Sequence, residues 1–388
     1  MSISTLMRDC IRAANGWSSN RAKSVFGDDS PEARKIQRRF KINAAAAYVG
    51  VSRQAIEKAE KEGRLPPADY IDSKGDNPRP IRAGYTLDQI EMMREHFNTQ
   101  PYRPENSEAV ILAIPGGKGG CYKTSTAVNF SQWCSLQGYR VLVIDIDPQA
   151  HLSMYFGYHP ELNTSINDTV MSYMIGDEDD LTYCVRNTAW PKLDIIPSHL
   201  QMQRLERELT EADIPYPPHA MLQAGIETIA DNYDIIIIDG HPDLGMGTMN
   251  MICASDVTLI ATSTEVNDIN STTQLMGLIA DIYDDNSPLE TTHEPVVRVL
   301  PTKLGGVGSS SQANVRDIMK IWQGLPLTNG IRVTDEVGKG QRRMASIYEQ
   351  ADEQRSSPAA WKRANDIFEA TFTEMLEELI KPFWSNEA

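Results

Sequence analysis

A glycine-rich segment between an apolar run and a helical pattern constrains this chain more than any other feature. The apolar run covers residues 109–114, and the segment reads Gly117-Lys-Gly-Gly-Cys-Tyr-Lys-Thr-Ser125. This succession predicts a strand, a loop and a helix N-terminus, in which backbone N–H groups and the helix dipole converge on the β- and γ-phosphates of a nucleotide. The chain is therefore expected to contain the fold of a nucleoside triphosphatase.

Single residues of this loop have separate expected roles. Lys123 supplies a positive charge to the phosphates, and the hydroxyl of Thr124 can ligate Mg²⁺. A second lysine, Lys118, lies five residues before Lys123 and marks a subclass of such loops, whereas Tyr122 stands where the general motif has glycine. The predicted nucleotide-binding segment consists of Gly117, Lys118, Gly119, Gly120, Cys121, Tyr122, Lys123, Thr124 and Ser125.

Carboxylates follow at the ends of two later apolar runs. Asp145 and Asp147 end the first run, and Asp239 ends a run of four isoleucines. At the edge of a parallel sheet, a carboxylate of the first pair can orient the attacking water or hold Mg²⁺-bound water, while Asp239 is expected in the outer shell of Mg²⁺. Three such elements in the expected order argue against the alternative that the loop is an ordinary structural turn.

Nearly continuous apolar runs predict strands that are covered on both faces. The candidate strands cover residues 109–115, 140–146, 192–197, 234–239, 256–262 and 296–302. Such runs indicate a mainly parallel, doubly wound sheet with helices on either side, hence an α/β P-loop fold. The amphipathic pattern over 359–384 predicts a terminal helix that covers this core. At 388 residues with 41 % apolar side chains, the chain has room for a second domain.

The composition limits where in the cell the protein is expected and what it can bind. No run approaches the length of a membrane-spanning helix, the N-terminus lacks a secretion pattern, and the five cysteines are scattered, so we expect a cytoplasmic protein with reduced thiols and no membrane contact. The net charge of −16 is uneven, because residues 1–107 carry 18 Lys and Arg against 14 Asp and Glu. This basic third suggests contact with a polyanion; the alternative is a solvated face without a partner.

The basic N-terminal third contains the pattern of a helix-turn-helix. Residues 42–49 form a small-residue helix, Gly50 a turn, and Ser52 the cap of a second helix. Residues 78–85 are the expected wing. The face expected to read a DNA major groove carries Ser52, Arg53, Gln54 and Lys58. A plain helical hairpin without a DNA role is the alternative.

A polar, proline-bearing stretch at 98–107 separates the region without strand runs from the α/β region. It divides the chain into an N-terminal helix assigned to dimerisation (1–30), an all-α winged helix-turn-helix domain with its linker (31–107) and the P-loop ATPase domain (108–388).

Within the acidic last domain, a local basic group consists of Lys339, Arg342 and Arg343. This group is the expected contact for phosphate backbones of any sequence, with a solvated face as the alternative.

The motifs together resemble those of the deviant-Walker ATPases. The resemblance rests on Lys118-Gly-Gly-Cys-Tyr-Lys-Thr124, on Asp145-Ile-Asp-Pro-Gln149 and on Asp239-Gly-His-Pro-Asp-Leu-Gly245. The N-terminal module, with Asp335-Glu-Val-Gly-Lys-Gly-Gln341 and Gln354-Arg-Ser-Ser357, is similar to the large plasmid and prophage partition ATPases of the ParA/SopA type. The similarity covers almost the whole chain from about Asp28.

The resemblance implies three catalytic residues. Lys118 would reach across an ATP-sandwich dimer to the phosphates of the partner and neutralise charge in the transition state. Lys123 would hold the β- and γ-phosphates, and Asp147 would position the lytic water.

It also implies the residues around the metal and the base. Thr124 and Asp239 would serve Mg²⁺, while Asp145 would support either Mg²⁺-bound water or only its own loop. Thr302 and Lys303, at the end of a late strand, match the position where relatives contact the base; a polar cap of the strand is the alternative.

Three residues depart from the family pattern or fit it ambiguously. Tyr122 would stack or hydrogen-bond near the nucleotide. Cys121 is read as a small filler rather than a reactive thiol, although a helix N-terminus lowers a thiol pKa. His241 would sense Mg²⁺ or phosphate, or is a surface histidine.

The implied function is DNA partition. ATP would dimerise the protein, the homodimer would coat nonspecific DNA on the nucleoid, and a centromere-binding partner of the ParB/SopB type would trigger hydrolysis of ATP to ADP. The N-terminal module would bind operator DNA and repress its own operon. Two alternatives are a membrane-cycling ATPase of the MinD type, against which the acidic stretch 374–378 counts, and a metabolic P-loop enzyme such as the nitrogenase iron protein, whose cysteine pattern is missing.

Overall fold

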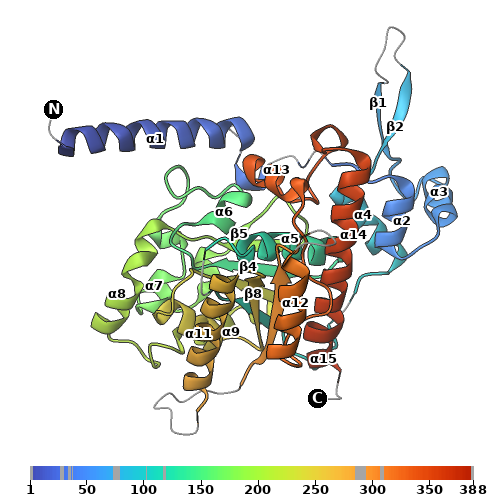
Figure 1. Ribbon diagram of the computed structural model, residues 1–388. Helices are drawn as coiled ribbons and strands as arrows, with labels where there is room; N and C mark the ends of the chain where they lie inside the picture. Colours follow the sequence, from blue (N-terminus) through green and yellow to red (C-terminus); the bar gives the residue numbers. More distant parts are fainter. Residues whose placement is uncertain are drawn as a thin grey trace.

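The computed structural model has a central sheet flanked by helices, with a small module and a long N-terminal helix attached to it (Figure 1). It describes residues 3–26, 30–33, 36, 38–72, 79–101, 103–116, 119–284, 294–305 and 310–385. None of the described helices is both long and apolar enough to cross a membrane.

The central sheet has seven strands in the order β5-β6-β4-β7-β3-β8-β9. Their bounds are β3 Val110–Ile114, β4 Val141–Asp145, β5 Arg186–Asn187, β6 Leu193–Ile196, β7 Ile235–Asp239, β8 Val257–Ser263 and β9 Val296–Thr302. All neighbouring pairs are parallel except β5 with β6. The six predicted strands agree with the observed ones within one residue at each end. The short edge strand β5 has no apolar run and was not predicted.

Both faces of the sheet are buried, as the apolar runs predicted. Alternate side chains of β7 enter different cores: Ile235 and Ile237 lie in one cluster with Phe130 of α5, whereas Ile236 and Ile238 lie in a second cluster under other helices. Parallel strands joined by crossover helices require this covering on both sides. The chain therefore has the mainly parallel, doubly wound α/β fold that was expected.

Helices connect the strands and cover the two faces (Figure 1). In the sheet domain they are α5 Lys123–Gln137, α6 His151–Tyr155, α7 Met171–Met174, α8 Leu205–Glu211, α9 Met221–Glu227, α10 Met246–Cys253, α11 Val266–Ile282, α12 Ser310–Ile321, α13 Asp335–Arg343, α14 Pro358–Met375 and α15 Lys381–Trp384. Short 3₁₀ turns are η1 Pro31–Ala33, η2 Ile166–Asp168, η3 Leu181–Cys184, η4 Leu200–Arg204, η5 Ala230–Asn232 and η6 Asp352–Gln354. A π-helical turn, η7 Leu376–Ile380, joins α14 to α15.

The small module contains the two helices and the turn that the sequence predicted. Helix α2 (Ile42–Val49) ends at Gly50, whose φ of 75° is left-handed, and helix α3 (Arg53–Lys61) begins after Ser52, which accepts a hydrogen bond from the N–H of Ala55. Strand β2 (Pro80–Gly84) lies within the predicted wing at 78–85 and pairs in antiparallel fashion with β1 (Asp69–Asp72), which precedes the predicted range. The expectation of an all-α module was wrong in this respect, because the wing adds two strands. Helix α4 (Leu87–Phe97) closes the module.

Buried polar contacts dock this module on the sheet domain. Arg94 of α4 is 2 % exposed and donates to the carbonyls of Tyr48 and Leu136, the second of which lies in α5. The hydroxyl of Tyr48 donates to Glu369 of α14, 3.2 Å away, and that carboxylate also accepts from the indole of Trp133. The boundary predicted at 98–107 thus joins two parts that share an interface.

Helix α1 (Ile3–Phe26) projects away from the remainder of the chain (Figure 1). Its apolar side chains Ile3 and Met7 are exposed, by 79 % and 51 %. The helix itself agrees with the prediction for residues 1–30, and its role in dimerisation stays a prediction.

The C-terminal helices cover the core, as their amphipathic pattern predicted. Phe368, Phe372 and Leu379 are fully buried. Glu374, in the acidic stretch of this segment, accepts hydrogen bonds from the N–H groups of Thr328 and Asn329 at 2.6 and 2.7 Å. This stretch is therefore part of the folded domain.

Candidate nucleotide site

The loop residues predicted to bind nucleotide meet the predicted carboxylates at one edge of the sheet. Asp145 of β4 and Asp239 of β7 are direct neighbours across the parallel ladder, and Ile114 of β3 pairs with Asp239 on its other side. Parallel strands bring their carboxyl ends to the same edge, where α/β proteins bind ligands. The glycine-rich loop leaves β3 at this edge and enters α5 at Lys123.

Lys123 lies inside the loop rather than in solvent. Its side chain is 6 % exposed and passes over Gly116, where an added Cβ would collide with the Cδ and Cε atoms of the lysine. Only glycine at this position leaves space for the lysine in this conformation. Gly117 and Lys118 lie outside the described residues, so their predicted roles remain predictions.

Asp239 is a buried carboxylate beside the hydroxyl of Thr124 and the charge of Lys123. Both of its oxygens are buried, and neither has a hydrogen-bond partner in the described part of the chain. Burial raises the pKa of Asp239 to about 7, against the opposing influence of the Thr124 hydroxyl and the Lys123 charge. Magnesium binds oxygen ligands and keeps several waters, so an unsatisfied carboxylate beside a threonine hydroxyl fits its outer shell.

Replacing Asp239 with asparagine will stabilise the metal-free protein increasingly as the pH rises from about 4 to about 7, with the full gain above neutral pH and little gain near pH 4. The pKa of the folded state exceeds the ordinary value of about 3.9, so the folded chain holds an extra proton and loses stability as the pH rises through that interval. The variant will gain on the order of 2 kcal/mol at about pH 8. Thermal unfolding in chelator at both pH values measures this gain. A gain in stability that appears only at the lower pH contradicts the raised pKa of Asp239. Asp366→Asn, on the exposed face of α14, is the control.

Asp145 and Asp147 are held differently. The carboxylate of Asp145 accepts hydrogen bonds from the N–H of Asp147 and from both the N–H and the hydroxyl of Ser153, at 2.6 to 3.0 Å. Burial and the neighbouring Asp239 raise the pKa of Asp145 well above its ordinary value. These contacts favour the loop-supporting role over the metal role that was also expected for this residue. Asp147 is 6 % exposed, and its Oδ1 accepts from the N–H of Gln149 at 2.8 Å.

Comparison with known proteins agrees with this geometry. The sequence model of a family described as AAA domain matches residues 109–291. Protein SopA of Escherichia coli (strain K12) is 43 % identical over 390 residues, which cover 99 % of each chain. The chain belongs to the SopA family of ParA-type P-loop ATPases.

Solved structures share the fold of this SopA-family protein. A structure titled Partition Protein superimposes with a TM-score of 0.64 at 18 % identity and covers 96 % of this chain and 97 % of its own. An ATP complex of a Cyanothece McdA variant gives a TM-score of 0.57 at 20 % identity over 70 % of this chain and 97 % of its own. At these identities the two comparisons establish a common fold.

Two left-handed residues face each other across the loop of the SopA-family protein. Tyr122 has a φ of 66° and Lys303 a φ of 51°, and the Lys303 Nζ lies 5.5 Å from the centroid of the Tyr122 ring. A left-handed backbone costs a side-chain-bearing residue about 1–2 kcal/mol, which explains why the general motif has glycine at the position of Tyr122. The pair is a cation–π contact above the turn that the loop makes.

Thr302 and Cys121 have structural contacts in this arrangement. The Thr302 hydroxyl is buried within hydrogen-bonding distance of the carbonyls of Cys121 and Thr262, at 3.0 and 3.1 Å. Thr302 therefore ties the loop to the sheet, and of the predicted base-contacting pair Lys303 is the more accessible. Burial raises the pKa of the Cys121 thiol, in agreement with a filler and not with a reactive thiolate.

The predicted DNA-contacting residues at α3 have acidic neighbours on the same helix. Arg53 donates to Glu57 at 2.8 Å, and the Lys58 ammonium lies 3.9 Å from Glu62. The side-chain oxygen of Ser52 caps the helix. Gln54 is exposed on the same helix.

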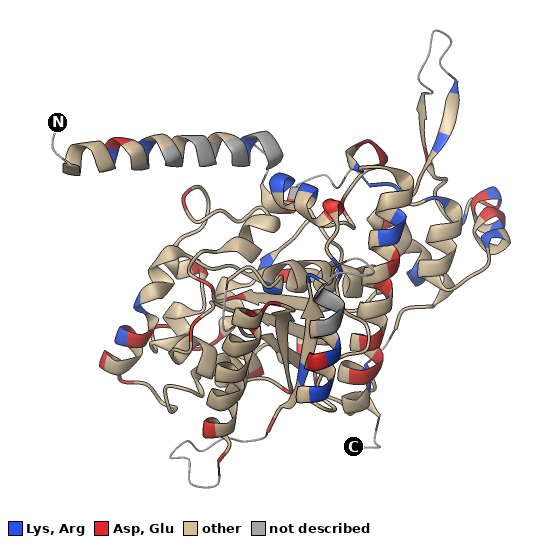
Figure 2. Cartoon of the chain, viewed as in Figure 1, with Lys and Arg blue, Asp and Glu red and all other residues tan. Residues whose placement is uncertain are grey.

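The second predicted DNA contact lies on a short helix. Lys339, Arg342 and Arg343 occupy α13, which has its N-cap at Thr334 (Figure 2). Arg342 and Arg343 are exposed, and Arg343 donates to the carbonyl of Gln354 at 3.0 Å. These residues are remote in sequence from α3 and belong to the sheet domain.

One of the two readings of His241 fits the structure, and two further residues, Gly116 and Ser153, contribute to the site without having been predicted. His241 lies 3.0 Å from Asp243 and is partly exposed, which fits a surface histidine. Gly116 leaves space for the Lys123 side chain, a role that its position directly before the glycine-rich segment could have indicated. Ser153 anchors Asp145, but a serine in a short helix gives no such signal in the sequence.

Proposed function

We propose that this protein is a plasmid partition ATPase that hydrolyses ATP to ADP and phosphate with Mg²⁺. Full-length similarity to SopA supports the partition role. The buried carboxylate of Asp239 lies next to Thr124 and Lys123, and its oxygens have no hydrogen bond within the described residues; this observation supports Mg²⁺-dependent hydrolysis and carries the proposal.

The mechanism that we infer assigns a role to each residue at the sheet edge. Lys123 holds the β- and γ-phosphates from within the loop, and Thr124 with Asp239 provides the metal shell. Bound Mg²⁺ supplies charge neutralisation on the phosphates. Asp147 orients the attacking water, and Lys118 of a second protomer completes the charge compensation in an ATP-bound homodimer. Asp145 keeps the loop that carries Asp147 in place.

The inferred partners follow from this cycle. The ATP-bound dimer binds nonspecific DNA, which places the protein on the nucleoid in the cytoplasm, and a ParB/SopB-type centromere-binding protein stimulates hydrolysis. The α2–α4 module binds operator DNA and represses the operon. No observation favours the MinD-type alternative, since the acidic stretch of the tail is packed through Glu374.

ATP hydrolysis by the purified protein tests the proposal. The rate is measured alone, with nonspecific DNA, with the protein encoded beside it, and with both. We expect a low basal rate and the largest stimulation with both additions. A rate that neither addition changes would exclude the partition cycle.

The two DNA surfaces will separate by mutation. Arg53→Ala and Lys58→Ala will abolish operator discrimination and spare ATP-dependent binding to random DNA, because base contacts specify and phosphate contacts position. The triple alanine variant of Lys339, Arg342 and Arg343 will do the reverse and flatten the salt dependence of nonspecific binding by about one unit of slope per lost contact. Fluorescence anisotropy with operator and random duplexes over a salt series measures both effects.

Lys362→Ala, on the exposed side of α14, is the matched control for loss of a surface charge. An unchanged salt slope in the triple variant would place the nonspecific surface elsewhere.

A further inference from the structure

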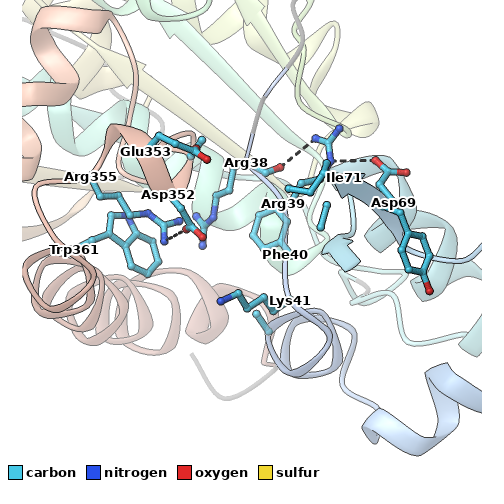
Figure 3. A pocket seen from close by; sticks show the side chains of 14 residues that line it. Arg38, Arg39, Phe40, Lys41, Asp69, Ile71, Asp352, Glu353, Arg355 and Trp361 are labelled. Carbon is cyan, nitrogen blue, oxygen red and sulfur yellow. Dashed lines mark hydrogen bonds and ion pairs between the residues drawn. The ribbon is translucent and has the colours of Figure 1, made fainter. Parts of the chain in front are cut away.

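A cavity of about 610 Å³ lies between the small module and the C-terminal part of the sheet domain (Figure 3). One side is formed by the segment before α2 and by β1, the other by residues 351–361. Four basic side chains line it, against three carboxylates: Arg38, Arg39, Lys41 and Arg355 face Asp69, Asp352 and Glu353. The nucleotide and DNA sites described above do not use this cavity.

Arg38 is a buried cation in the wall of the cavity. It is 5 % exposed, and its guanidinium donates to the carbonyl of Tyr348 at 2.9 Å. The guanidinium carbon lies 4.4 Å from the ring centroid of Phe40 and 4.9 Å from that of Trp361. Within the described ranges no carboxylate lies at ion-pairing distance from Arg38. A buried charge without a counter-ion is costly, and burial with the nearby charge of Arg355 lowers the pKa of Arg38.

Arg355 stacks on the same indole as Arg38. Its guanidinium carbon lies 4.0 Å from the centroid of Trp361, so two like charges share one aromatic ring. Asp352 pairs with Arg355, yet the Nε of Arg355 is buried and has no partner in the described part of the chain.

The remaining charged residues of the lining do not cancel the excess positive charge of the cavity. Arg39 forms an ion pair with Asp69 at 3.1 Å on the far side (Figure 3). Lys41, which is exposed and precedes α2, adds a further cation. Glu353 is exposed and is the remaining carboxylate of the lining.

We propose that this cavity binds a phosphate group. Guanidinium groups match phosphate oxygens with paired N–H donors, and an ammonium adds a point charge, so Arg38, Arg355 and Lys41 form a suitable donor set. The anion offsets the repulsion between the two arginines on Trp361. Arg38 and Lys41 belong to the N-terminal part and Arg355 to the C-terminal part, so the bound phosphate also ties the small module to the sheet domain.

Two sources present this chemistry, a phosphate of the DNA backbone and a soluble phosphate. The cavity lies beside the wing strand β1, so a duplex on the small module can reach it. Phosphate binding in the cavity requires neither ATP hydrolysis nor operator recognition.

The test uses the full chain with Lys123→Ala, so that the glycine-rich loop contributes little to anion binding. Thermal unfolding is followed with increasing sodium phosphate and, at equal ionic strength, with sodium chloride. We expect phosphate to raise the unfolding temperature beyond chloride, and Lys41→Met to weaken the apparent phosphate affinity about tenfold. Lys362→Met is the control and keeps the full response.

Arg38→Met is the second variant, because it keeps the stacking volume and removes the buried charge. It will lose the phosphate response while remaining folded. A random DNA duplex that competes with phosphate identifies the DNA backbone as the source, and a duplex without effect identifies a soluble phosphate; both outcomes support the site. Equal responses to phosphate and chloride, or an undiminished phosphate response in both Lys41→Met and Arg38→Met, overturn it.

Discussion

Replacing Lys123 with alanine will weaken ATP binding about a hundredfold, whereas replacing Lys118 will leave the affinity close to that of the wild type and lower turnover about a thousandfold. Lys123 is buried against Gly116 within the loop, so its charge acts on the phosphates whenever the nucleotide is bound. Lys118 is inferred to act from the facing protomer, where it compensates charge that develops only in the transition state. Fluorescent-nucleotide titration and steady-state hydrolysis measure the two quantities.

Lys362→Ala, which removes an exposed lysine of α14, is the control. Equal losses of nucleotide affinity in the two loop variants would reject this division of labour. A Lys118→Ala protein that hydrolyses ATP at the wild-type rate would remove that lysine from the mechanism.

The sheet and its binding edge could be predicted because both follow from local pattern. Buried parallel strands need unbroken apolar runs, and four isoleucines at 235–238 leave no other interpretation. Since parallel strands end at one edge, Asp145 and Asp239 had to meet the glycine-rich loop, and the register places them side by side.

The individual roles at that edge depend on contacts that no pattern encodes. Asp145 and Asp239 are both aspartates at strand ends, yet Ser153 satisfies the first and nothing described satisfies the second. The left-handed backbones of Tyr122 and Lys303 likewise result from the tertiary arrangement, because the two residues are far apart in the sequence.

The same limit applies to surfaces and interfaces. The residues of α3 were predicted as a DNA-reading face, and the structure adds that Glu57 pairs with Arg53 one helical turn away. Arg38 was counted only within the basic N-terminal third, whereas the structure buries it between Phe40 and Trp361. Burial of a charge depends on residues more than three hundred positions away, which local sequence reasoning cannot place.

Asp147→Ala will lower ATP turnover by about a hundredfold to a thousandfold while the protein still binds ATP and dimerises. The carboxylate is almost fully buried at the sheet edge and is oriented through the N–H of Gln149, as a group that positions water requires. Water position affects the transition state more than ground-state binding, so turnover and affinity respond separately. Hydrolysis assays with sedimentation analysis in ATP measure both, with Asp366→Ala as a matched surface control. Rapid turnover by the Asp147 variant, or loss of its ATP-dependent dimer, would contradict the assigned role.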